Sequence, residues 1–152
     1  MRSPIPSLII VAAFGLPVLA QTGGAPAAAA MPYSDSFAQD SRVFELRTYH
    51  ANPGKLDALN ARFREHTNAL FEKHGMTLVA YWMPIAPPTD GSGGTLIYVL
   101  AYPSVEARDA AWKAFNADPE WISVRDASER EGKLLSKIDS VLMKATDYSK
   151  IK

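Results

Sequence analysis

The chain has 152 residues, of which 47% are hydrophobic and 21% charged, a composition that suits one globular domain and leaves no room for a second core. Its 16 basic and 16 acidic residues cancel, and neither sign gathers in a run, which argues against nucleic acid or an anionic membrane surface as a partner. Cysteine is absent from the sequence, so thiol catalysis, thiolate metal sites and disulfides are excluded.

The first 20 residues have the features of a secretory signal peptide. Arg2 supplies a positive start, an apolar run follows from Leu8 to Leu19, and Ala20 gives the small residue expected before cleavage. An uncleaved anchor is the alternative, but a membrane span takes about 20 apolar residues, and prolines interrupt this segment. We expect cleavage after Ala20, a periplasmic or secreted protein, and no stable membrane span after cleavage.

Residues 21–40 are mainly Ala, Gly, Pro, Ser and Gln, with little apolar surface to bury. Such a segment does not offset the entropy cost of ordering, so it predicts a flexible linker. The folded domain is then expected at 41–148, followed by a short tail at 149–152. Without disulfides, this domain must be stabilised by its own core or by a partner subunit.

The first predicted strand, Val43 to His50, has two different faces. Side chains alternate along a strand, so one face carries Val43, Glu45, Arg47 and Tyr49, and the other carries Phe44, Leu46, Thr48 and His50. The second set is mostly apolar, whereas the first contains two charges. We expect the charged set to lie on the open face of the sheet.

A helix ending near His74 is predicted after the turn Asn52-Pro53-Gly54-Lys55. Its apolar positions recur at steps of three and four, the period of one buried helix face, at Leu56, Leu59, Phe63, Thr67, Leu70 and Phe71. Gly75 is expected to follow it as a C-cap. A second strand then extends from Leu78 to Met83.

The segment from Pro84 to Gly94 predicts a loop. It contains Pro87-Pro88 and Asp90-Gly91-Ser92-Gly93-Gly94, but it lacks the lysine and the following helix of a phosphate-binding P-loop. A third strand is expected directly after it, at Thr95 to Tyr102.

Two helices and a last strand complete the predicted elements. Ser104 is placed to cap the first helix, and Asp118 and Pro119 take the N-cap and first helical positions of the second. The apolar stripe of the first of these helices consists of Ala111, Trp112 and Phe115. The second helix is expected to end near Glu131, and the last strand to extend from Ile138 to Ala145.

The order strand, helix, strand, strand, helix, strand predicts an α+β fold of the ferredoxin-like βαββαβ type, with a four-stranded antiparallel sheet. The helices pack on one face of such a sheet, and a single chain leaves the other face open. Two copies can close their sheets face to face into a dimeric α+β barrel, so we expect a homodimer.

Five short motifs resemble the NIPSNAP family in order and spacing: Glu45-Leu46-Arg47-Thr48-Tyr49, Pro53-Gly54-Lys55, Tyr81-Trp82, Ala101-Tyr102 and Asp118-Pro119-Glu120-Trp121. The likeness covers about 42–148 and implies a dimeric α+β barrel, a fold shared with cofactor-free monooxygenases and haem enzymes. It supplies no catalytic residue set. The export signal argues against the mitochondrial binding and signalling roles of animal members, and Pro103 departs from the polar turn residue that is more usual there.

Glu45 and Arg47 are the sharpest candidates for a site. A guanidinium on an open sheet face can clamp a carboxylate or an enolate oxygen with two parallel hydrogen bonds. The alternative, which we prefer, is a structural ion pair of Arg47 with Glu45 or with the partner subunit, because a buried charge must be paired. The aromatic candidates for a pocket lining or a dimer interface are Tyr49, Tyr81, Trp82 and Tyr98.

The three histidines have no metal-ligand spacing, and we expect neither a metal nor a cofactor. His66 is interpreted as a core or rim residue hydrogen-bonded to the sheet, with a pocket ligand or proton carrier as the alternative. His74 is interpreted as a helix C-terminal cap and His50 as a surface group at a strand end. Serine hydrolase chemistry has no support, since the sequence contains no Gly-x-Ser-x-Gly elbow.

Two functions from different classes follow. The preferred one is an exported homodimeric binding or accessory module for a small apolar or carboxylate-bearing molecule, or for a protein. The alternative is a cofactor-independent oxygenase or isomerase, in which Arg47 stabilises an anionic intermediate and His66 or Tyr81 moves protons. This alternative requires the three side chains to converge on one solvent-connected cavity.

Overall fold

The computed structural model describes residues 36–86 and 88–152. The predicted signal peptide and the predicted linker up to residue 35 lie outside the described residues. Within the described part, four strands form an antiparallel sheet in the order β2-β3-β1-β4. They are β1 (Val43–Ala51), β2 (Thr77–Trp82), β3 (Thr95–Tyr102) and β4 (Leu135–Lys144). The predicted α+β class and βαββαβ order are confirmed.

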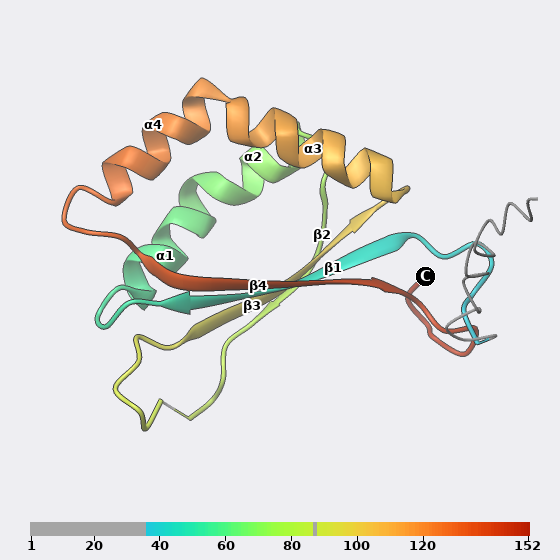
Figure 1. Cartoon of the computed structure of the whole chain (residues 1–152), viewed down its shortest axis with the longest axis horizontal. Helices are drawn as coiled ribbons and strands as arrows, with labels where there is room; N and C mark the ends of the chain where they lie inside the picture. The colour runs from blue at the N-terminus through green and yellow to red at the C-terminus, as the bar shows by residue number, and fades with distance from the viewer. Residues whose placement is uncertain (1–35, 87) are drawn as a thin grey trace, which may run out of the picture. The chain divides into compact units, whose positions relative to one another are not determined.

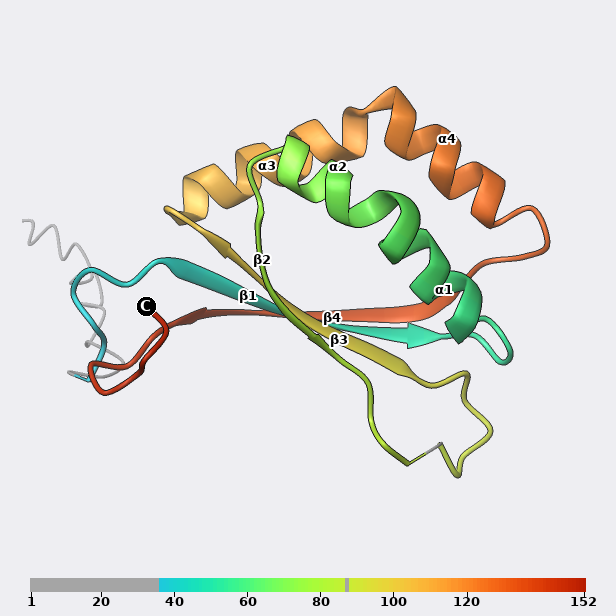
Figure 2. The ribbon, with the colours of Figure 1, turned by 180° about the vertical axis from the view of Figure 1, so that it is seen from behind.

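The helices cover one face of this sheet, as Figure 1 and the reverse view in Figure 2 show. The first helical rod consists of α1 (Leu56–Arg62), the π-helical turn η1 (Phe63–Thr67) and α2 (Asn68–Lys73). The later helices are α3 (Val105–Ala117) and α4 (Pro119–Ser128). The opposite face carries no helix of the described residues.

The first helical rod buries the side that its periodicity predicts. The predicted positions Leu59, Phe63, Thr67, Leu70 and Phe71 are buried, and Arg62 is buried beside them. The rod ends before Gly75, whose φ of +78° is a left-handed conformation that glycine adopts without a steric penalty. The π-helical turn could not be predicted from the sequence. The buried positions within and after it still recur at steps of three or four, as in an ordinary α-helix.

The two predicted helix caps are present. The Ser104 hydroxyl accepts a hydrogen bond from the Ala107 N–H at 3.1 Å and starts α3. The Asp118 carboxylate accepts one from the Glu120 N–H at 2.8 Å and starts α4. Asp118 itself is extended, with φ −69° and ψ 121°, so one residue makes the corner between the two helices. α4 ends at Ser128, before the predicted end.

The glycines at the end of the 84–94 loop allow a close approach to the end of β1. Ala51 donates its N–H to the Gly94 carbonyl at 2.9 Å, and Gly93 donates to the Ala51 carbonyl at 3.2 Å. A Cβ atom at Gly93 would overlap the Asn52 carbonyl oxygen. Close packing of the chain therefore explains why glycine is needed at this position.

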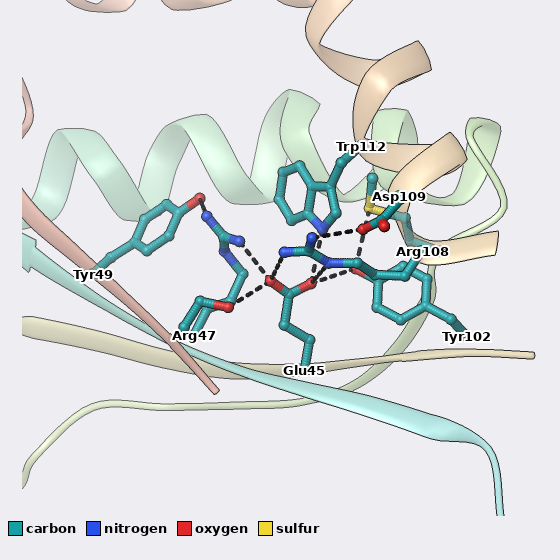
Figure 3. Close-up of polar contacts among 9 residues, drawn as sticks. Glu45, Arg47, Tyr49, Tyr102, Arg108, Asp109 and Trp112 are labelled. Atoms are coloured by element: carbon teal, nitrogen blue, oxygen red, sulfur yellow. Dashed lines mark hydrogen bonds and ion pairs between the residues drawn. The ribbon is translucent and has the colours of Figure 1, made fainter. Parts of the chain in front are cut away.

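The two faces of β1 are the reverse of the predicted ones. β1 is paired with β3 on one side and β4 on the other, and its residues Glu45, Arg47 and Tyr49 point towards the helices (Figure 3). Phe44 and Leu46 consequently belong to the open face. The prediction that the charged set lies on the open face is wrong, because α3 supplies polar partners that compensate the buried charges, and strand alternation does not reveal those partners.

The two ends of the domain pair with each other. Phe37 forms a bridge with Thr146, and the Ala38 N–H donates to the Ala145 carbonyl at 3.0 Å, so the last residues of the predicted linker already belong to the fold. The Arg42 side chain donates to the Lys152 carbonyl at 3.0 Å and holds the tail. Among the described residues, no helix has the length and apolar character that crossing a membrane requires.

Candidate functional site

Glu45 is the centre of a buried polar network on the helix-facing side of β1 (Figure 3). Its side chain is 0% exposed and accepts six hydrogen bonds within the described part of the chain. The donors are Arg47 Nη1 (2.7 Å), Arg108 Nε (3.1 Å) and Nη2 (2.6 Å), Trp112 Nε1 (2.8 Å), the Tyr102 hydroxyl (3.0 Å) and the Ser140 hydroxyl (2.7 Å). The network therefore joins β1, β3, β4 and α3.

These donors fix the charge state of Glu45. Burial raises the pKa of the Glu45 carboxyl, but hydrogen bonds from Arg108, Ser140 and Trp112 and the charge of Arg47 outweigh burial and lower that pKa to about 2. Glu45 is therefore ionised at neutral pH. This state suits a structural anchor and does not suit a general acid or base.

Arg47 lies between this network and a cavity. Its Nη1 pairs with Glu45 at 2.7 Å, so the structural ion pair is present, and its side chain is 12% exposed. The guanidinium carbon lies 4.2 Å from the ring centre of Trp112 and 5.4 Å from that of Tyr49. The Arg47 Nε–H is buried and has no hydrogen-bond partner among the described residues. Glu45 and, at 3.5 Å, the Tyr49 hydroxyl thus accept hydrogen bonds from the two terminal nitrogens of this guanidinium, and its Nε–H donates none within the described residues.

Arg62, the last residue of α1, is a second buried guanidinium, with a side chain 4% exposed. Its Nη1 lies 3.2 Å from the Ser128 hydroxyl and 3.4 Å from Glu129 Oε1, the long end of the hydrogen-bond range. Its Nε–H is buried without a partner in the described residues. Burial lowers the pKa of Arg62, and the attraction of Glu129 offsets this only in part. The guanidinium carbon lies 5.2 Å from the Trp121 ring centre.

Arg47 and Arg62 line one cavity of ≈ 530 Å³ between the sheet and the helices. Its aromatic lining residues are Tyr49, Phe63, Phe71, Trp112, Phe115 and Trp121. Its charged lining residues are Arg47, Arg62, Arg108, Arg125, Glu129 and Lys133. Flat aromatic walls combined with several basic groups can hold a planar molecule that carries negative charge.

The structure separates the aromatic candidates. Tyr49 lines the cavity together with Arg47, and Tyr98 is fully buried next to Tyr49, with ring centroids 5.1 Å apart. The Tyr81 hydroxyl donates to the Asn68 side-chain oxygen at 2.8 Å, and Tyr81 lines a different surface depression. Trp82 lies on the open face of the sheet and is 52% exposed.

His66 is exposed on η1, so the prediction of a core or rim histidine bonded to the sheet is wrong. His66 is the residue before the buried Thr67, and neighbouring side chains on a helix point in different directions around its axis. The His66 side chain therefore points away from the sheet. His66 lines a groove between the first helical rod and α4 and is not part of the Arg47 cavity lining, although Arg62 lines both. Arg47, His66 and Tyr81 therefore do not converge, and the oxygenase or isomerase alternative lacks the geometry it requires.

The other two histidines connect elements. His74, the C-cap residue of α2, lies 2.7 Å from the Asp118 carboxylate, and Lys73 lies 2.8 Å from it. Hydrogen bonds from Lys73 and His74 hold the pKa of Asp118 well below its usual range. These contacts fasten the end of α2 to the start of α4. His50 lies 2.8 Å from Asp139 and links β1 to β4.

Sequence reasoning missed Arg62 and Arg108. Arg62 follows Leu59 by three residues, and Arg108 precedes Ala111 by three, so both lie on the inward sides of their helices, where Arg62 is buried and the Arg108 side chain is 23% exposed. A charged residue at such a position is unusual, because arginine is rarely buried without a partner. This signal could have identified both residues before the structure was known.

Solved structures of NIPSNAP proteins share this fold. A NIPSNAP family protein with unknown function from Agrobacterium tumefaciens is 20% identical and aligns with a TM-score of 0.66, covering 77% of this chain and 99% of its own. An uncharacterized NIPSNAP-like domain protein from Burkholderia xenovorans is 17% identical, with a TM-score of 0.62 and coverage of 72% and 90% respectively. None of the curated proteins that were compared matches the chain.

A monooxygenase from Streptomyces coelicolor, solved with nanaomycin D, is more distant, with 15% identity, a TM-score of 0.46 and coverage of 74% of this chain and 94% of its own. A likeness at that level carries no functional argument, and the structural matches above show the fold alone. The sequence profile of the NIPSNAP family, however, matches residues 44–150, most of the chain. The chain therefore belongs to the NIPSNAP family, whose members have the dimeric α+β barrel fold.

Proposed function

We propose that this domain binds a small organic anion with a planar apolar body in the cavity between its helices and its sheet. The observation that carries the proposal is Arg62, a buried guanidinium that lines the cavity and has only long contacts to its partners. A buried charge is costly unless it is well paired. An incoming anion supplies the missing partner.

A carboxylate fits the available donors. The Arg62 guanidinium is under-satisfied, since its Nη1 makes only long contacts and its Nε–H has no partner among the described residues. Its terminal Nη1 and Nη2 groups together match the two oxygens of a carboxylate. Arg47 lines the same cavity and also has an unused Nε–H. Lys133, exposed at the cavity, adds positive charge that attracts an anion from solution.

The walls of the cavity favour a planar apolar body for this anion. A volume of ≈ 530 Å³ falls within the range of about 300–1,000 Å³ that is typical of small-molecule sites. Trp112 and Trp121 line the cavity, each next to one of the two guanidiniums. Their rings present flat apolar surface beside positive charge.

Binding is preferred to an oxygenase or isomerase function because the groups needed for proton transfer do not meet. His66 and Tyr81 lie in separate depressions, and Glu45 is held as a carboxylate by its six hydrogen bonds. Among the described residues, Glu129 is the one carboxylate in the cavity lining, and it already contacts Arg62. The cavity thus offers an anion site without a placed acid and base.

The proposal includes a homodimer. The open face exposes Trp82 and Val141, which are 52% and 53% exposed, and Val141 pairs with the partly buried Leu46. A second copy that covers this face would remove these side chains from water. The open face, and not the cavity, is therefore the surface proposed for self-association.

Export is proposed from the signal-like features of the first 20 residues. Cleavage after Ala20 predicts that the mature chain starts at Gln21. Intact mass measurement on the protein purified from its native host tests this prediction. A mature chain that begins at Met1 would contradict it.

Isothermal titration calorimetry with 2-naphthoate tests the binding function, and 2-naphthalenemethanol serves as the uncharged probe of similar shape. The wild-type protein is expected to prefer 2-naphthoate, and Arg62→Met is expected to weaken its binding by about tenfold or more, equivalent to about 1.4 kcal/mol. Arg130→Met is the matched control, because Arg130 is exposed and is not part of the cavity lining. Equal binding of both probes, or equal effects of the two substitutions, would contradict the proposal.

A further inference from the structure

Glu129 occupies the place that a ligand carboxylate would take. Its Oε1 is 3.4 Å from Arg62 Nη1, and both residues line the cavity. We infer that Glu129 is an internal substitute for the ligand, which occupies Arg62 in the empty protein and gives it up when an organic carboxylate binds. The inference rests on the proposed function and names the residue that limits the affinity of that site.

The contact between Arg62 and Glu129 is suited to replacement. It is 3.4 Å long, whereas the structural pair of Arg47 and Glu45 is 2.7 Å long. The Glu129 side chain is 19% exposed, and within the described residues its carboxylate accepts a hydrogen bond from Arg62 alone. Glu45, with six donors, cannot leave without exposing them, but Glu129 leaves a single weak contact. A ligand that makes two short hydrogen bonds to Arg62 gains more than this contact loses.

Glu129 also has space to move away. It is the C-cap residue of α4, and none of the ten residues of that helix is buried. The turn that follows contains Gly132, with φ +107°. Because Glu129 stands at a helix end and is partly exposed, its side chain can turn into solvent without repacking of buried residues. Release of Arg62 therefore requires a side-chain rotation and leaves the core unchanged.

If Glu129 competes with the ligand for Arg62, substitution of Glu129 should tighten ligand binding. If the pair only held Arg62 in place, the same substitution should not tighten it. Glu129→Gln keeps the shape of the side chain and removes its charge, so it should tighten 2-naphthoate binding by about three- to tenfold, a change of up to about 1.4 kcal/mol. It should leave the affinity for 2-naphthalenemethanol unchanged. Glu129→Asp, which keeps the charge but shortens the reach, should also tighten 2-naphthoate binding. Calorimetric titration of each full-length variant measures these affinities.

Glu131→Gln is the matched control, since Glu131 is an exposed acid two residues further along and not part of the cavity lining. Unchanged or weaker 2-naphthoate binding by Glu129→Gln, with Arg62-dependent binding by the wild type, would overturn the inference and leave the proposed function in place. Equal tightening by Glu131→Gln, or equal tightening of both probes, would overturn it as well. Absence of Arg62-dependent binding in the wild type and in Glu129→Gln would refute the proposed function itself.

Discussion

The two faces of the sheet differ in what they bury. The helix-covered face holds Glu45 at 0% exposure with six hydrogen bonds, next to the guanidiniums of Arg47 and Arg108. The open face exposes large apolar side chains such as Trp82 and Val141. Charge is thus buried where partners from several elements are already in place, and apolar surface is exposed where the chain alone provides no cover. Whether a residue of this sheet is buried therefore depends on which groups of other elements are there to contact it. The polarity of the residue alone does not decide this.

Removal of the Glu45 carboxylate should strongly lower the stability of the fold, through the helix-covered face of the sheet. Glu45→Ala leaves Arg47 and Arg108 without their shared partner, and an uncompensated buried charge costs about 3–5 kcal/mol. Urea unfolding should show this loss of the free energy of unfolding. Glu65→Ala, at an exposed acid of η1, is the control and should change it by less than about 0.5 kcal/mol. A loss below about 1 kcal/mol for Glu45→Ala would show that the network does not stabilise the fold.

Acid should weaken the same face without any substitution. The pKa of Glu45 is lowered from 4.5 to about 2 in the folded protein, so its contribution is complete above about pH 4.5 and is lost as the pH falls towards 2. The expected loss is roughly 3 kcal/mol over that window. Urea unfolding at several pH values, compared between the wild type and Glu45→Gln, isolates the part that belongs to Glu45. Parallel pH profiles of the two proteins would contradict the assignment.

The fold was predictable because its signals are local. Apolar steps of three and four placed Leu59 and Phe63 in the core, and the caps at Ser104 and Asp118 marked the starts of two helices. The orientation of β1 was not predictable from such signals. Alternation divides a strand into two faces, but the buried face depends on which residues approach from the helices.

The site was predictable only in its β1 part. The spacing of Glu45 and Arg47 on one strand face suggested an ion pair, and this pair is present at 2.7 Å. Arg108 and Arg62 come from helices distant in sequence, and only the packing of those helices on the sheet brings them to the site. His66 was misplaced, because a position at the edge of a helix stripe becomes exposed after a small rotation.

A charge introduced on the open face should weaken self-association, whereas a charge introduced on the helix side of the same strand should not. Val141→Asp places a carboxylate on the surface proposed for self-association, and we expect it to weaken the dimer by more than about 2 kcal/mol, roughly 30-fold. Leu142→Asp is the matched control, because Leu142 is the next residue, is similarly exposed at 44%, and points to the helix side in register with Glu45. Native mass spectrometry measures both. A monomeric wild type, or equal dissociation by both variants, would contradict the open-face interface.

The smallest expected effect tests whether the Glu45 network acts as a unit. Tyr102→Phe removes one of the six hydrogen bonds, at 3.0 Å, and should cost about 1 kcal/mol in urea unfolding. Tyr148→Phe, at a side chain 81% exposed, should have no measurable effect. The five bonds that persist should keep Glu45 ionised, so Tyr102→Phe should retain the loss of stability in acid. A cost close to that of Glu45→Ala would instead mean that the hydrogen bonds strengthen one another, and that the helix-covered face fails as a whole when one of them is lost.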